Sequence, residues 1–310
     1  MQRLIGLATL FIVATPHFCR ADDRADATQL PVVAEHKYRM LARVRPFLFW
    51  ISKDNVGGAR LSWRGDAEGA FGLDLLIGSD PQRAPRRINR WGYIAEQVSG
   101  SNARVVGVMK QSDEQSVKEA ESRVATDGQG GFVYRAIQGT VTANQASAGV
   151  TTVRVERDLT FRDIEPLLAL VSTTSQNGEY RSVTLPAGMR SGFLVALKDL
   201  VNQGIAAPST QTDRRTSPAR AAISYVYFGM FYDLTMKSSE PMKTARIDGR
   251  VYNDVVRSDF EITNRSDGGT TRFQLTYGTS GPLAGIPVHI VYQPRWWFEV
   301  QLFLDDETPF

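Results

Sequence analysis

The sequence predicts an α+β fold, in which a predominantly antiparallel β-sheet carries about three short helices packed on one face. Two observations predict the sheet: apolar and polar residues alternate over several runs, and turn sequences rich in glycine and aspartate separate those runs. A third observation predicts the helices, because three segments carry apolar residues at helical spacing on one side only. Such amphipathic segments need a surface to cover, so we expect them to pack on the sheet.

The clearest hairpin spans residues 59–77, where apolar and polar residues alternate on both sides of a Gly/Asp turn at 65–69. This alternation indicates two paired strands with one apolar and one polar face. A short strand is expected at 104–110. Two more are expected in the Val-, Thr-, Tyr- and Phe-rich stretch 132–161.

Helices are expected near 113–125, 163–172 and 191–203. Ser112 and Gln115 have the spacing of a capping box, which predicts the start of the first helix. The second carries isoleucine, leucine and valine on one side, and the third does the same with phenylalanine, leucine and valine before a glycine ends it.

The segment 204–220 has no apolar periodicity and reads as a linker or a long surface loop. From there to the end, β structure is expected. The aromatic-rich stretch 225–231 and the stretch 288–292 predict strands, 264–269 predicts a hairpin turn, and alternate apolar residues over 296–304 predict one final strand.

The first residues have the features of a secretory signal peptide, with Arg3 before an apolar run at 4–14 and small residues up to Ala21. That run is shorter than the about 20 residues that span a bilayer. We therefore expect an exported protein, periplasmic or extracellular, with no transmembrane segment in its mature chain. The expected organisation is a signal peptide at 1–21, a flexible leader at 22–36, an α+β region at 37–203, a linker or long loop at 204–220, and an antiparallel β region at 221–310 that can be continuous with the first.

Cleavage after Ala21 would remove Cys19, the one cysteine of the chain, and leave His36 and His289 as the two histidines. A mature chain without a thiol excludes disulfides, cysteine nucleophiles, iron–sulfur clusters and thiolate zinc sites. We expect no cofactor and no metal site. The formal net charge of +3 provides no strong field to attract nucleic acid, so no nucleic-acid partner is expected.

The leading candidate binding site is the loop at 78–92, where two prolines and the bounding glycines disfavour regular structure. Guanidinium groups there could hold an anion, and aromatic rings beside them could stack on a ligand. The residues are Arg83, Arg86, Arg87, Arg90, Trp91 and Tyr93. The alternative is that the two aromatic residues anchor the loop in the core while the arginines are solvated.

Trp297 is the second candidate binding residue, because adjacent residues of a strand face opposite sides and Trp296 would take the core side. An exposed tryptophan can stack on a sugar or fill a pocket of a partner, unless a helix or the linker covers it. Asp74 lies between two apolar neighbours of the 59–77 hairpin, so it is expected on the opposite, solvated face.

No nucleophile motif such as G-x-S-x-G occurs, and no glycine-rich phosphate loop precedes a helix. We therefore expect an exported, non-enzymatic binding or assembly protein of the bacterial cell envelope. Its partner would be an anionic or amphipathic envelope ligand or another envelope protein. The alternative is a carboxylate-dependent hydrolase acting on envelope polysaccharide, which needs neither histidine nor cysteine.

Overall fold

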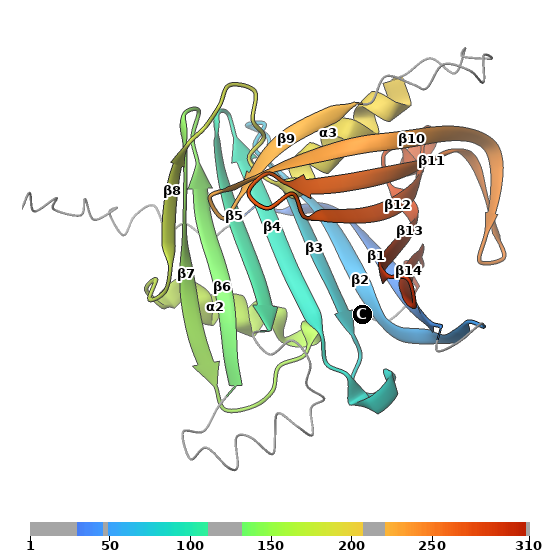
Figure 1. Cartoon of the computed structure of the whole chain (residues 1–310), viewed down its shortest axis with the longest axis horizontal. Helices are drawn as coiled ribbons and strands as arrows, with labels where there is room; N and C mark the ends of the chain where they lie inside the picture. Colours follow the sequence, from blue (N-terminus) through green and yellow to red (C-terminus); the bar gives the residue numbers. More distant parts are fainter. Residues whose placement is uncertain (1–29, 46–48, 111–131, 207–220, 308–310) are drawn as a thin grey trace, which may run out of the picture.

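The computed structural model describes residues 30–45, 49–110, 132–206 and 221–307. These residues form one antiparallel sheet in the strand order β8-β7-β6-β5-β4-β3-β2-β1-β14-β13-β12-β11-β10-β9 (Figure 1). Neighbours in this order are also neighbours in sequence, except where β1 pairs with β14. The prediction of a predominantly antiparallel sheet is confirmed.

The strands of the first half are β1 (Val32–Val44), β2 (Ile51–Gly65), β3 (Phe71–Ser79), β4 (Trp91–Ser99), β5 (Asn102–Lys110), β6 (Phe132–Val141), β7 (Gln145–Val155) and β8 (Tyr180–Thr184). Those of the second half are β9 (Ala222–Tyr227), β10 (Met230–Ile247), β11 (Arg250–Asn264), β12 (Thr270–Gly278), β13 (Pro287–Arg295) and β14 (Phe298–Leu304). Short 3-10 turns follow as η2 (Pro85–Arg87), η3 (Phe161–Asp163) and η4 (Gly281–Leu283).

Most of the predicted strands are present. The hairpin expected at 59–77 is β2 and β3, in which Leu61 lies opposite Leu75. The strand expected at 104–110 is β5, and the two expected within 132–161 are β6 and β7. The expected turn at 264–269 joins β11 and β12, where the amide of Asn264 donates to the carbonyl of Gly269 over 2.9 Å.

The pairing of β1 with β14 makes the two expected regions, 37–203 and 221–310, parts of one sheet. Strand β1 begins at Val32, so residues 32–36 of the expected leader belong to a strand and pair with β2. The expected signal peptide at 1–21 and most of the expected linker at 204–220 lie outside the described residues.

The described residues contain two α-helices, α2 (Ile164–Thr173) and α3 (Phe193–Ala206). The helix expected at 113–125 lies outside them. The expectation that the helices share one face of the sheet is wrong, because α2 packs with Tyr93 and Ala95 of β4 while α3 packs with the alternate residues Ile94 and Val98. Successive residues of a strand face opposite sides, and β4 is apolar on both.

Helix α3 lies between the two halves of the sheet, which cross one another in Figure 1. Leu194 and Val195 pack with Leu73 of β3. Nearly two turns further on, Leu200 and Val201 belong to the core cluster formed by β9 to β12. A single helix therefore joins the apolar inner surfaces of both halves, and its burial accounts for much of the core between them.

The two edges of the sheet meet at a short seam beside β8 and β9. The amide of Arg190 donates to the carbonyl of Ser224 over 2.8 Å, and the amide of Val226 donates to the carbonyl of Arg190 over 3.1 Å. Near this seam, Tyr227 of β9 approaches β5 so closely that a Cβ on Gly107 would lie 2.2 Å from its hydroxyl. The seam and this contact cover part of what would otherwise be open sheet edges.

The strand expected at 225–231 is interrupted, because Phe228 and Gly229 form the turn between β9 and β10. Both residues have positive φ, 49° and 64°, as the tight turns of β-hairpins require. Aromatic composition marks strand positions here but does not reveal the turn. Within the described residues, neither helix is long and apolar enough to cross a membrane.

Candidate functional site

The loop between β3 and β4 is fixed at its base and open at its tip. Asp80 is buried and pairs with Arg83 at 3.6 Å and with Arg162 at 3.0 Å. The guanidinium of Arg83 also donates to Oδ1 of Asn55 on β2 over 2.7 Å. Arg83 is therefore a structural ion-pair partner, and its guanidinium is occupied by contacts within the protein.

The tip presents three exposed arginines, Arg86, Arg87 and Arg90. Arg86 and Arg87 have φ of 55° and 54°, in the left-handed region that is uncommon for residues other than glycine. The side chains of these three arginines have no hydrogen bond or ion pair with the described residues. The tip thus offers uncompensated positive charge, as the binding hypothesis requires of these three residues.

Trp91 and Tyr93 lie in the core instead of beside the loop tip. Trp91 is 7% exposed, donates from its indole nitrogen to the carbonyl of Leu159 over 3.0 Å, and stacks on Tyr134. Tyr93 is also buried, in the cluster beneath α2. These two positions follow the alternative interpretation, in which aromatic residues anchor the loop and cannot stack on a ligand.

Trp297 is exposed, but not through the strand alternation that the sequence suggested. Strand β13 ends at Arg295 and β14 begins at Phe298, so Trp296 and Trp297 form the turn between them. Both are exposed, by 67% and 45% respectively. The structure therefore separates the candidate residues into a buried aromatic pair, a paired Arg83, an exposed arginine tip and an exposed tryptophan turn.

Replacing Arg86, Arg87 and Arg90 together by alanine will leave the free energy of unfolding within about 0.5 kcal/mol of the wild type. The reason is that their side chains are exposed and unpaired among the described residues. Urea denaturation followed by circular dichroism measures this. As the matched contrast, Arg83→Ala will destabilise the protein measurably, because it removes a contact to the buried Asp80. Equal stability of both variants would contradict the distinction between the structural Arg83 and the unpaired arginines of the tip.

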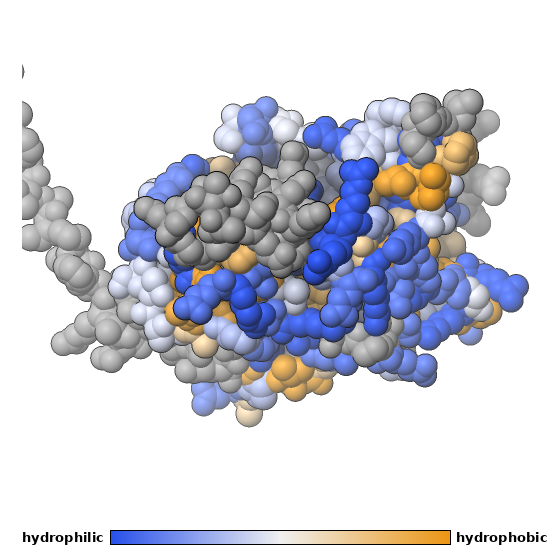
Figure 2. Space-filling view, turned by 90° about the horizontal axis from the view of Figure 1, so that it is seen from below, coloured by the Kyte–Doolittle hydropathy of each residue, from blue (hydrophilic) through white to orange (hydrophobic). Residues whose placement is uncertain are grey.

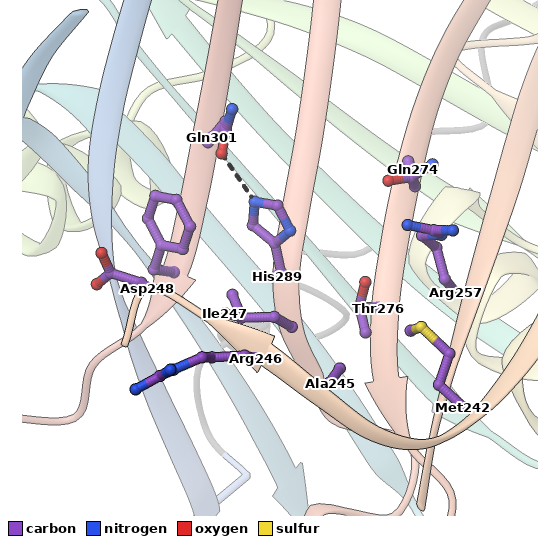
Figure 3. Close-up of a pocket in the computed structure, with 11 residues that line it drawn as sticks. Met242, Ala245, Arg246, Ile247, Asp248, Arg257, Gln274, Thr276, His289 and Gln301 are labelled. Atoms are coloured by element: carbon purple, nitrogen blue, oxygen red, sulfur yellow. Dashed lines mark hydrogen bonds between the residues drawn. The ribbon is translucent and has the colours of Figure 1, made fainter. Parts of the chain in front are cut away.

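A cavity of about 510 Å³ lies where strand β10 crosses the face of β12 to β14 (Figure 3). Polar side chains line one wall and the apolar end of β10 covers the other. The lining residues are Met242, Ala245, Arg246, Ile247, Asp248, Arg257, Gln274, Thr276, His289, Gln301 and Phe303. The volume lies in the range of sites that hold small molecules.

The wall of the cavity is a connected polar and aromatic surface. Nε2 of His289 donates to Oε1 of Gln301 over 3.1 Å, and its ring stacks on Phe303 with the centroids 4.7 Å apart (Figure 3). Burial lowers the pKa of His289 below its ordinary value. The ring is therefore neutral at pH 7, so that Nδ1 remains as a hydrogen-bond acceptor.

Two arginines line the cavity, and one of them is paired. Arg257 pairs with Glu240 over 2.5 Å. Arg246 is exposed and has no hydrogen bond or ion pair with the described residues. Asp248 is the one acid in the described lining, and it shares the guanidinium of Arg39 with Asp54 and Asp305. Arg246 is therefore free to hold an anionic group, with Gln274 and Gln301 nearby as further polar partners.

Sequence reasoning missed this cavity. Its residues come from five consecutive strands, β10 to β14, and they meet because β10 extends beyond its pairing with β9 and crosses the sheet. One signal was available, since His289 is one of only three histidines and lies in a predicted strand. The cavity's suitability for an anionic group depends on Arg246, which no motif distinguishes from the other arginines.

Two acids are buried inside the fold and have structural partners. Asp74 is 3% exposed and pairs with Arg64 over 2.6 Å, so the expectation that it lies on a solvated face is wrong. Both faces of its strand are covered, and an ion pair compensates its burial. Glu96 of β4 is fully buried. Its carboxylate accepts hydrogen bonds from the backbone amides of Leu194 and Val195 at the start of α3, each over 2.9 Å.

Burial raises the pKa of Glu96 to about 7, although the three backbone amides of α3 that bind it act in the opposite direction. The carboxylate thus satisfies donors that a helix start leaves unpaired. Because its oxygens are occupied by α3 and it lines no described cavity, we assign Glu96 a structural role.

No family model matches the chain, and no curated protein does. Two solved structures are similar at low identity. One is a β-barrel-like protein of the domain of unknown function DUF1849 from Brucella abortus, with 9% identity, a TM-score of 0.45, and coverage of 88% of this chain and 96% of that one. The other is a candidate lipoprotein from Parabacteroides distasonis, with 10% identity, a TM-score of 0.24, and coverage of 88% and 95%. Both TM-scores are too low to establish a shared fold or function.

Proposed function

We propose that the protein is an exported, non-enzymatic binding or assembly protein of the bacterial cell envelope, and that it holds an anionic amphipathic ligand in the cavity beneath β10. The cavity carries this proposal, because it combines an unpaired cation with an apolar cover. Arg246 would bind the charged group of the ligand, while Met242 and Ile247 would contact its apolar part. The predicted signal peptide supports the envelope location.

The alternative, a hydrolase of envelope polysaccharide, has less support. Such an enzyme needs two carboxyl groups about 5 to 9.5 Å apart across the cleft, one of them protonated. In the described lining of the cavity, Asp248 is the one acid, and it pairs with Arg39. No described residue of the lining could serve as the second carboxyl group.

Arg246→Ala will weaken binding of dodecyl phosphate about tenfold, as expected for the loss of one charge-assisted hydrogen bond. Isothermal titration calorimetry measures this, with dodecyl maltoside as an uncharged probe of similar chain length. Arg90→Ala, which removes an exposed arginine outside the cavity, is the matched control and will bind as the wild type does. Equal affinity of the Arg246→Ala variant would overturn the assignment of the cavity.

The natural ligand can be sought by mass spectrometry of material that co-purifies with the protein from its native envelope fraction. A stoichiometric anionic lipid or glycolipid would support the proposal. Turnover of an envelope polysaccharide by the purified protein would instead establish the hydrolase alternative.

A further inference from the structure

We propose that one end of the sheet docks on the surface of an anionic lipid bilayer through an exposed aromatic tip, formed by Val44, Phe49, Ile51, Trp296 and Trp297. This surface is separate from the cavity beneath β10, which none of these residues lines. The proposal therefore does not depend on the proposed ligand.

The tip is formed by the end of β1, the start of β2 and the β13–β14 turn, which lie side by side. Val44 at the end of β1 pairs with Ile51 of β2 on one side and with Phe298 of β14 on the other. In addition, the amide of Arg45 donates to the carbonyl of Trp297 over 2.7 Å. The start of β2 and the β13–β14 turn are thus held together by backbone pairing, at the lower right of the molecule in Figure 1.

The side chains of the tip are unusually exposed for their apolar character. Trp296 is 67% exposed, Phe49 60%, Ile51 49%, Trp297 45% and Val44 38%. Single exposed apolar residues are common on soluble proteins, but a contiguous group of them marks an interaction surface. Tryptophan is the residue that favours the interface between water and lipid, since its ring is apolar and its nitrogen can donate to a headgroup.

Cations outnumber acids in the strand ends that form the tip, and the acids Asp54 and Glu299 lie directly beyond them. The stretches 41–53 and 291–298 contain no acid and four cations, namely Arg43, Arg45, Lys53 and Arg295. Arg43 is paired with Glu299. The Nε atom of Arg45 is buried, whereas Arg295 and Lys53 are exposed. This arrangement complements a surface of anionic headgroups.

The cationic surface continues beyond the tip. Because β3 is antiparallel to β2, the β3–β4 loop with Arg86, Arg87 and Arg90 lies at the same end of these strands as the tip. Figure 2 shows the molecule from below, where most of the described surface is hydrophilic and apolar residues are exposed in separate patches. Positive charge spread over several strands, with apolar side chains projecting from turns, fits a broad anionic surface better than a single peptide.

Sedimentation with lipid vesicles tests the proposal, using the purified protein with vesicles of phosphatidylcholine or of phosphatidylcholine mixed with phosphatidylglycerol. We expect binding to the anionic vesicles that weakens as salt is added. The double substitution Trp296→Ser and Trp297→Ser will lower the partition coefficient at least about tenfold. Tyr180→Ser is the matched control, because Tyr180 is 63% exposed but lies on the edge strand β8, and it will leave binding unchanged.

The charge contribution is tested separately by Arg295→Glu, which will lower binding to anionic vesicles about fivefold or more. Lys243→Glu is its control, since the Lys243 side chain is 96% exposed and lies on β10, which contributes no residue to the tip. Binding that is equal in the wild type, the double tryptophan variant and Arg295→Glu would overturn the proposal. So would analytical ultracentrifugation showing that the tryptophans hold two copies of the chain together, because the tip would then be a protein interface.

Discussion

Replacing Gly192 by alanine will lower the free energy of unfolding by about 3 kcal/mol. A Cβ at this position would lie 2.3 Å from the carboxyl carbon of Glu96 and 2.4 and 2.5 Å from its two oxygens. The buried carboxylate would have to move away from the amides of Leu194 and Val195, from which it now accepts hydrogen bonds. Both the crowding and the unpaired amides destabilise the start of α3, and urea denaturation measures their combined effect.

Gly92→Ala is the matched control for this substitution. Gly92 lies on β4, the same strand as Glu96, but the nearest atom to its added Cβ is the carbonyl oxygen of Val108 at 3.9 Å. That distance is an ordinary contact, so the change will cost less than about 1 kcal/mol. If both glycine substitutions destabilise the protein equally, the contact between Gly192 and the carboxylate of Glu96 does not determine how α3 is anchored.

The free energy of unfolding will fall by about 3 kcal/mol as the pH rises from about pH 5 to about pH 8, through the titration of Glu96. The pKa of this carboxyl is about 7 in the folded protein against a model value of 4.5. Between these values the folded state binds more protons than the unfolded state. The stabilising contribution is therefore fully present below the unfolded pKa and is lost as the pH rises through the folded pKa.

The variant Glu96→Gln isolates this contribution, because glutamine has a similar shape and does not titrate. His289 acts in the opposite direction over part of the range, since its lowered pKa makes the folded state less stable as the pH falls through the ordinary value of 6.5. The quantity to compare is therefore the difference in unfolding free energy between wild type and variant at each pH. A difference that does not change with pH would show that Glu96 is not the titrating group.

The elements of the fold could be predicted where local pattern determines them. The helix expected at 163–172 is observed at Ile164–Thr173, and the one expected at 191–203 is observed at Phe193–Ala206. Both patterns are local, since they depend on helical spacing and on capping residues. The hairpin of β2 and β3 was predictable for the same reason, because its turn and its alternation lie within one short stretch.

The placement of these elements could not be predicted in the same way. Whether α2 and α3 share a face depends on which side of β4 each one meets, and β4 is apolar on both sides. Asp74 is buried and pairs with Arg64 because α2 covers that face of the sheet. The alternation within the hairpin suggested that this face is exposed to solvent. Alternation within one strand says which residues share a face but not what covers it.

The candidate site was partly predictable. Composition identified an arginine-rich loop, and Arg86, Arg87 and Arg90 are exposed as a binding loop requires. Composition could not show that the neighbouring Trp91 begins β4 and packs into the core, away from these arginines. The exposure of Trp297 was expected, but its cause is a turn where the sequence pattern favoured a strand.

The pairing of β1 with β14 has a consequence for the order in which the chain acquires structure. Tyr38 lies opposite Leu304, so the ladder that joins the two halves connects residues near both ends of the chain. Contacts of such high sequence separation form slowly, since a long loop must close first. A chain released gradually, by synthesis or by translocation, could not complete its sheet until β14 had emerged. Until then β1 and β13 would each have an unpaired edge, which makes chaperone protection most valuable at that stage.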